Sequence, residues 1–269
     1  MPLFEISLAE WSLHRSLFTR RLRHLDFPRV AKEDYGIEAI ELVNRFFKDK
    51  ARDRKHLAEF KKRADDLGVR ILLIMCDDEG DLGDAVEARR KHAVENHIQW
   101  LEAAKFFGCH SIRVNARSTG SYAEQLERAA DGLHRLAEAA VKYDLHVLVE
   151  NHGGLSSDAS WLVSVIKRVG LPNCGTLPDF GNFKISLRKE YDRYLGVAEM
   201  MPFAKGVSAK SQSFDTNGNE TRTDYRRMMK IVLDAGYRGY FGIEYSGLRM
   251  GEANGIRATK RLLERIRDA

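Results

Sequence analysis

Short apolar runs that follow a glycine recur along the chain, and each comes after a longer stretch with the spacing of a helix. Glycine just past the last helical turn is a common left-handed cap, so each glycine predicts the end of a helix and the start of a strand. The pattern occurs at Gly68 before residues 69–74, Gly108 before 109–114, Gly170 before the run ending at Asp179, and Gly236 before the run ending at Glu244. The chain is therefore predicted to alternate helices and strands.

Apolar residues between these runs recur at gaps of four and three, which places them on one face of a helix. One such face consists of Tyr122, Leu126, Ala129, Leu133, Leu136 and Ala140, and another of Val94, Ile98, Leu101 and Ala104. We expect both faces to cover a sheet.

The full pattern predicts eight strands, each followed by a helix. We place the strands near residues 3–8, 38–42, 69–74, 110–115, 146–150, 174–179, 205–209 and 240–244. A chain of 269 residues has the length of one (β/α)8 TIM barrel, about 250 residues, so we predict an α/β barrel as a single domain over residues 1–269. The alternative is a doubly wound open sheet, but no strand is followed by a dinucleotide- or phosphate-binding glycine pattern.

Composition narrows the function classes. A hydrophobic fraction of 43%, a charged fraction of 31% and only 5 prolines are typical of a globular protein with a sizeable core. The net charge of +5 comes from cations mixed with acids, and the one unbalanced cluster, residues 20–24, has no aromatics for stacking bases, so we predict no nucleic-acid partner. No stretch is long enough to span a bilayer, which predicts no membrane partner.

The cysteines predict the compartment. Cys76, Cys109 and Cys174 are an odd, widely spaced set, which argues against both a disulfide framework and a zinc ribbon. A reducing cytoplasm fits best, although a leader removed beforehand would leave no trace in the sequence.

Three acids close three of the apolar runs: Glu150, Asp179 and Glu244. The carboxyl ends of the strands of a closed barrel converge on one mouth, so we expect these side chains to meet there. Carboxylates that meet repel one another unless a cation neutralises them, which predicts a divalent metal. The alternative for any one acid is a helix N-cap or a simple ion pair.

The segments around these acids carry a family resemblance. The motifs are Val149-Glu150-Asn151-His152-Gly153-Gly154, Leu177-Pro178-Asp179-Phe180-Gly181-Asn182-Phe183, Lys205-Gly206-Val207-Ser208-Ala209-Lys210 and Gly242-Ile243-Glu244-Tyr245. Together they resemble the sugar phosphate isomerase/epimerase family with a xylose isomerase-like barrel, over nearly the whole chain.

The resemblance implies a ligand set. It makes Glu150, Asp179 and Glu244 metal ligands and Glu150 and Glu244 the acid/base pair. Relatives commonly carry histidine where this chain has Ser208 and Asn182, and a site without imidazole disfavours zinc. Oxygen ligands suit manganese or magnesium, or calcium, better than softer-ligand metals.

Further side chains are expected to contact a carbohydrate substrate. They are His152, Asn182, Ser208, Lys210, Glu41, Asn115, His14 and Trp11. Lys210 has the alternative of pairing with Asp179 or Glu244, and the acidic loop 76–81 is predicted to be solvated because its spacing does not match a calcium loop.

These parts imply proton transfer next to a sugar carbonyl through an enediolate, giving an isomerase or epimerase. One alternative is a lyase that acts on oxidised (keto) glycosides by β-elimination. A non-catalytic sugar-binding barrel is another, and an endonuclease at abasic sites is disfavoured because it depends on many histidines. Barrels of this family are often dimers or tetramers, so a homo-oligomer stays open, as does the identity of the sugar and whether it is phosphorylated.

Overall fold

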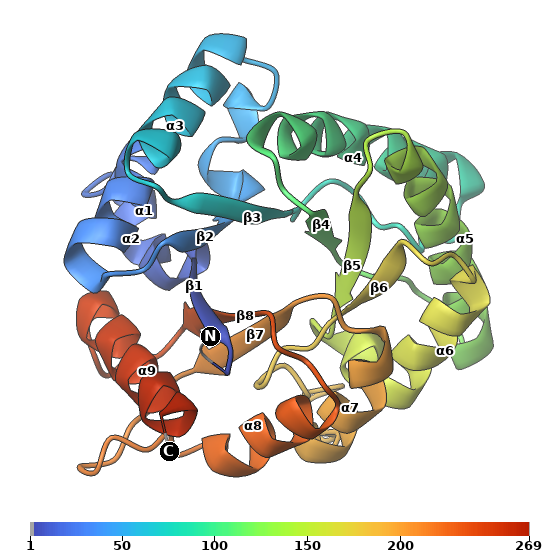
Figure 1. Ribbon diagram of the computed structural model, residues 1–269. Helices are drawn as coiled ribbons and strands as arrows, with labels where there is room; N and C mark the ends of the chain where they lie inside the picture. The colour runs from blue at the N-terminus through green and yellow to red at the C-terminus, as the bar shows by residue number, and fades with distance from the viewer. Residues whose placement is uncertain (1–2, 269) are drawn as a thin grey trace.

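The computed structural model describes residues 3–268 and shows a ring of parallel strands surrounded by helices (Figure 1). The strands are β1 (Glu5–Ala9), β2 (Ala39–Val43), β3 (Arg70–Met75), β4 (Ser111–Val114), β5 (His146–Glu150), β6 (Cys174–Leu177), β7 (Val207–Ser211) and β8 (Tyr240–Tyr245). Each lies within about two residues of its predicted position, because parallel strands buried on both faces need near-continuous apolar runs, which are visible in the sequence.

The strands follow the order β6-β5-β4-β3-β2-β1-β8-β7. β6 and β7, at the two ends of this order, are joined by two isolated parallel bridges, Thr176 to Ala204 and Asp179 to Ser208. These bridges close the ring and confirm the (β/α)8 barrel, so the open doubly wound sheet is excluded. The second bridge also sets Asp179 beside Ser208.

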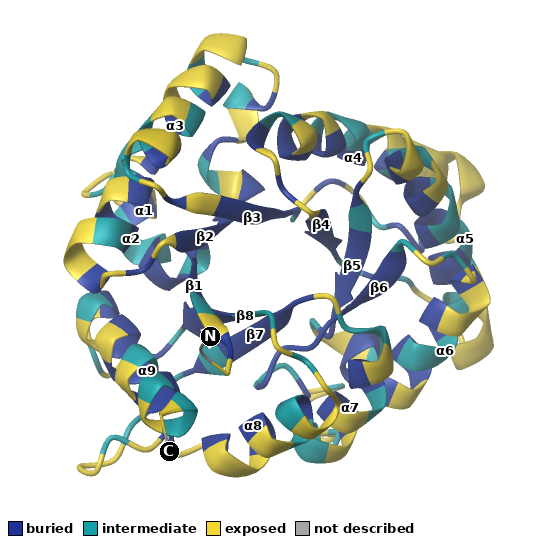
Figure 2. Ribbon diagram, viewed as in Figure 1, coloured by how far each residue is buried: buried dark blue, intermediate teal, exposed yellow. Residues whose placement is uncertain are grey.

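The helices lie outside the ring, with their buried faces toward the strands (Figure 2). They are α1 (His14–Phe18), α2 (Phe27–Tyr35), α3 (Arg54–Asp66), α4 (Glu87–Phe107), α5 (Tyr122–Val141), α6 (Ala159–Val169), α7 (Arg193–Met200), α8 (Tyr225–Asp234) and α9 (Glu252–Arg267). Within residues 3–268, no helix has the length and apolar character needed to cross a membrane.

Helix α5 illustrates how well the periodicity predicted packing. Leu133, Leu136 and Ala140 are fully buried, as expected. Tyr122 is not part of this face, since it is 48% exposed. It is the first residue of the helix, directly after the Ser121 N-cap, so it lies too near the end to pack on the sheet.

The four glycines expected to end helices do adopt a left-handed conformation, with φ of 64° at Gly68, 78° at Gly108, 68° at Gly170 and 85° at Gly236.

A glycine inside α5 marks a close approach between a helix and a loop. A Cβ added at Gly132 would lie 1.8 Å from the backbone carbonyl oxygen of Leu82. We expect Gly132→Ala to destabilise the protein by about 1–3 kcal/mol, although alanine favours helices, because the loop must move away. Urea denaturation measures this, with Glu138→Ala on the exposed side of α5 as the control, expected within about 0.5 kcal/mol of the parent. A Gly132→Ala protein as stable as the parent would contradict the close approach between Gly132 and the Leu82 carbonyl.

Candidate active site

The three strand-ending acids come together as expected. Glu150 is the last residue of β5, Asp179 follows β6 by two residues, and Glu244 is the penultimate residue of β8. Their exposed fractions are 1%, 0% and 4%, and each offers a carboxylate oxygen that lies within 4.8 Å of those of the other two. The barrel therefore gathers three buried carboxylates at one point.

Asp179 is fixed by its neighbours on the β6 and β7 side. Its Oδ1 accepts backbone N–H groups of Gly181 and Asn182, both at 2.8 Å, and its Oδ2 accepts the hydroxyl of Ser208 at 2.8 Å. The side-chain amide of Asn182 donates to Glu150 Oε1 at 2.9 Å. Asn182 and Ser208, the two positions without histidine, thus hold the carboxylates by hydrogen bonds.

Two cations lie among the carboxylates. Lys210 Nζ is 2.5 Å from Glu244 Oε1 and 3.8 Å from Asp179 Oδ2, so the pairing alternative weighed for this lysine is present. Arg113 lies on β4. Its Nε is 2.7 Å from Glu150 Oε2, and its Nη1 is 2.8 Å from Asp77 Oδ1. Sequence reasoning missed Arg113 and Asp77; the available signal was an arginine inside an otherwise apolar strand.

Burial perturbs the ionisation of the three acids. It raises the pKa of Glu150 and of Asp179 to about 7, because Arg113 and Lys210 offset only part of the lost solvation. Burial also raises the pKa of Glu244, but Lys210, together with Arg113 and His152, outweighs burial, so the pKa of Glu244 falls below its usual value. A further positive charge here would stabilise the ionised form of all three carboxylates.

The donor set fits a hard divalent cation. Glu150, Asp179, Glu244 and Asp77 set four carboxylates against the two cations Arg113 and Lys210, which leaves two negative charges when all are ionised. Glu150 Oε2 is buried and has no hydrogen-bond partner among the described residues, since the nearby Arg113 N–H is not aimed at it. Oxygen-only donors are those that magnesium and manganese prefer.

Two cavities open beside the carboxylates, and Lys210 lines both. The smaller holds about 170 Å³, and besides Lys210 its lining includes the site residues Glu244, Trp11, Asn115, His152, Arg113 and Asp77. The larger holds about 690 Å³ and includes Asn182. Asn115 also donates to Asp77 Oδ1 at 2.9 Å.

Glu150 and Asp179 do not line either cavity, and neither do three of the side chains expected to contact the substrate. Glu41 is buried in the barrel, accepts the hydroxyl of Ser7 at 2.6 Å and packs where Gly242 has no side chain. His14 has its Nδ1 2.7 Å from the carbonyl oxygen of Trp11 and stacks on that ring at 4.9 Å. Ser208 donates its hydroxyl to Asp179, as described above.

The acidic loop 76–81 is not simply solvated, which corrects the prediction. Glu79 is 5% exposed and accepts the side-chain amide of Asn44 at 2.9 Å, and Asp77 pairs with Arg113. Only Asp78 behaves as expected, with a side chain that is 57% exposed.

A closed parallel barrel with converging carboxylates at one end defines the class of the protein. The chain belongs to the xylose isomerase-like TIM barrel family, whose sequence profile matches residues 29–269. This confirms the resemblance stated from the motifs. No curated protein matches the chain in sequence.

Solved structures with this fold include several sugar epimerases. The apo 3-keto-D-glucoside 4-epimerase YcjR of E. coli superposes with a TM-score of 0.73 at 16% identity, covering 98% of this chain and 100% of that one. The D-psicose 3-epimerase of Clostridium cellulolyticum H10 with D-tagatose gives 0.76 at 12% identity, covering 98% and 99%. An L-ribulose 3-epimerase gives 0.74 at 17%, covering 98% and 95%. At these identities the likeness establishes the fold.

Proposed function

We propose that this protein is a sugar isomerase or epimerase that moves a proton next to the substrate's carbonyl group. The observation that carries this proposal is the convergence of Glu150 and Glu244. They come from β5 and β8, which stand three strands apart in the ring, so their carboxylates approach one point from different sides of the barrel. Family membership and epimerases among the structural neighbours support the same assignment.

In the proposed reaction, one glutamate removes the C–H proton beside the carbonyl, which leaves an enediolate. Return of a proton to the neighbouring carbon interconverts aldose and ketose. Return to the same carbon from the opposite face inverts that centre, which is epimerisation. The contact with Arg113 orients Glu150, and Lys210 orients Glu244.

We infer that a divalent cation is held by Glu150, Asp179 and Glu244, with manganese or magnesium suiting the oxygen donors best. When bound, the ion polarises the carbonyl and neutralises negative charge on the enediolate. His152, Asn182 and the aromatic ring of Trp11 are the proposed walls around the sugar.

Manganese should stabilise the folded protein. A cation at a hundredfold excess over its dissociation constant contributes about 2.7 kcal/mol, so thermal unfolding should shift upward on titration, with one ion bound per chain by calorimetry. Asp179→Asn should abolish the shift, whereas Asp65→Asn, an exposed carboxylate on α3, should not. If the midpoint of thermal unfolding of the parent protein did not change at millimolar manganese or magnesium, the proposed cation site would be refuted.

The function itself is tested with a panel of ketoses incubated in deuterated water. Isotope incorporated into recovered sugar, read by NMR, is expected for at least one ketose, together with its isomer or epimer. No exchange with any sugar, combined with measurable sugar affinity, would instead indicate a non-catalytic binding barrel.

A lyase is the second candidate, and a specific observation favours keeping it. YcjR, with the same fold, is named as acting on a keto-glucoside, and the 690 Å³ cavity is large for a single sugar ring. The same enediolate can expel a leaving group at the β-position. Release of an aglycone from a 3-keto-glucoside, without isotope in recovered starting material, would support elimination over epimerisation.

A further inference from the structure

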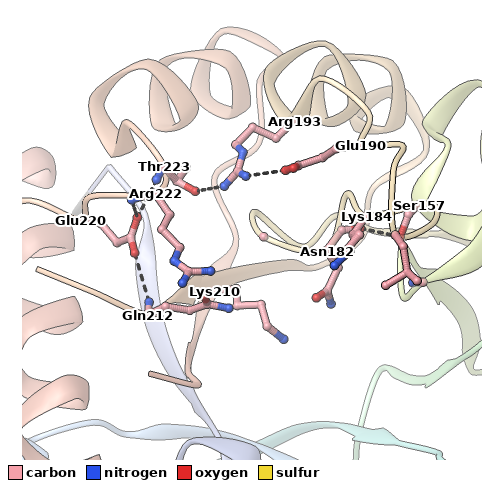
Figure 3. Close-up of a pocket in the computed structure, with 13 residues that line it drawn as sticks. Ser157, Asn182, Lys184, Glu190, Arg193, Lys210, Gln212, Glu220, Arg222 and Thr223 are labelled. Carbon is pink, nitrogen blue, oxygen red and sulfur yellow. Dashed lines mark hydrogen bonds and ion pairs between the residues drawn. The ribbon is translucent and has the colours of Figure 1, made fainter. Parts of the chain in front are cut away.

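The larger cavity lies beside the carboxylates and is built from two loops. Antiparallel bridges from Lys184 to Glu190 and from Phe214 to Glu220 turn the segments after β6 and β7 into hairpins around it. The charged side chains of its lining are Lys184, Glu190, Arg193, Lys210, Glu220 and Arg222 (Figure 3). Two of its lining residues contact the carboxylate site, Asn182 through Glu150 and Lys210 through Glu244.

The two acids in this lining are already committed to protein groups. Glu190 pairs with Arg193 at 2.8 Å. Glu220 is 7% exposed, and its two oxygens accept four backbone N–H groups, those of residues 212, 213, 222 and 223, at 2.6–3.1 Å. The charge of Glu190 is therefore balanced by Arg193, and the hydrogen-bonding capacity of the Glu220 carboxylate is taken up by the backbone.

Two of the cations, in contrast, have no acidic partner. Lys210 is held by Glu244 and Arg193 by Glu190, but no carboxylate of the described residues lies within 4.0 Å of the charged groups of Lys184 or Arg222. Figure 3 shows the guanidinium of Arg222 reaching toward the same space as the head groups of Lys210 and Asn182. The lining therefore carries two cations whose charge no carboxylate pairs with.

The size of the cavity sets the length of the ligand. About 690 Å³ lies within the range of sites for drug-sized ligands, which exceed one sugar ring. A substrate whose reacting carbons lie at Glu150 and Glu244 leaves room beyond Asn182, toward Arg222. The guanidinium of Arg222 is a planar fork of donors and the side chain of Lys184 ends in an ammonium, and each matches a phosphate or a carboxylate.

We propose that this cavity binds an anionic group at the far end of the sugar substrate, with Arg222 and Lys184 as the specificity-determining residues. The proposal rests on the proposed function for the position of the sugar. The recognised chemistry is an oxyanion; a phosphate ester and a carboxylate are its two sources.

Calorimetric titration of the full chain tests this without relying on turnover. The ligands are D-fructose 6-phosphate, D-glucuronate and neutral D-fructose, each with manganese present. At least one anionic sugar should bind about tenfold more tightly than D-fructose, and added salt should weaken that preference. Tighter binding of D-fructose 6-phosphate would identify the anionic group as a phosphate, and tighter binding of D-glucuronate would identify it as a carboxylate.

The variant Lys184→Gln/Arg222→Gln should remove the tenfold preference and leave the affinity for D-fructose unchanged. The control is Arg188→Gln/Arg226→Gln, which removes the same charge from the same two regions at exposed positions outside the lining. It should keep the preference. Equal affinities of the parent for all three ligands, or equal effects of both variants, would overturn the proposal.

This experiment separates the subsite from the function. Isotope exchange into D-fructose with no anionic preference would sustain the isomerase and remove the subsite. Anionic preference that depends on Arg222 and Lys184, without exchange into any sugar, would sustain the subsite and remove the isomerase.

Discussion

Glu150→Gln and Glu244→Gln should each lower the rate of isotope exchange by about 10²–10⁴-fold, the usual contribution of a positioned general acid or base. Glutamine keeps the shape and can still accept the hydrogen bond that Asn182 donates to Glu150, so folding should be preserved. The measurement is deuterium incorporation by NMR on the ketose that the parent enzyme converts, with thermal unfolding to verify the fold.

Asp78→Asn is the matched control. Asp78 lines the smaller cavity, but it is largely exposed and pairs with Arg45 rather than joining the carboxylate group. Its φ of 58° is a conformation that asparagine adopts readily. We expect exchange within a fewfold of the parent. A Glu150→Gln enzyme as active as this control would refute the acid/base assignment.

Arg113→Met should be among the most destabilising single changes in the chain. The arginine is 4% exposed and is the cation between Asp77 and Glu150, so its removal leaves buried carboxylates without compensation. Breaking one side of a buried ion pair typically costs about 3–5 kcal/mol of unfolding free energy. Urea denaturation at neutral pH measures the loss.

A double-mutant cycle distinguishes lost charge compensation from lost packing. Asp77→Asn added to Arg113→Met removes one uncompensated carboxylate and should restore part of the stability, so the two changes should be clearly non-additive. Arg117→Met, at an exposed arginine nearby, should stay within about 0.5 kcal/mol of the parent. Additive effects of Asp77→Asn and Arg113→Met would mean that the ion pair contributes little.

The strands and the meeting of the acids were predictable from the sequence because both follow from a short-range pattern. An apolar run buried on both faces is visible directly, and a parallel barrel brings all strand ends to one edge, so Glu150, Asp179 and Glu244 had to lie near one another. The pairing of Ser208 with Asp179 follows in the same way from strand position.

Other parts of the site depend on contacts that no local pattern encodes. Arg113 pairs with Glu150 and Asp77 across neighbouring strands and a loop, so its partners depend on the register between β4 and β5 and on the path of residues 76–81. The larger cavity depends on how two hairpins fold over the barrel end. Glycine and polar residues predict such loops but not the shape they enclose.

The closure of the barrel has one more consequence. β6 and β7 meet through two isolated bridges, while all other neighbouring strands are paired as ladders, so the ring is joined most weakly at Asp179 and Ser208. A ligand bound by both Asp179 and Glu244 would link the two sides of this junction. Ligand binding would then reduce local opening of the barrel between β6 and β7, so the rigidity of the fold would depend on whether the ligand is bound.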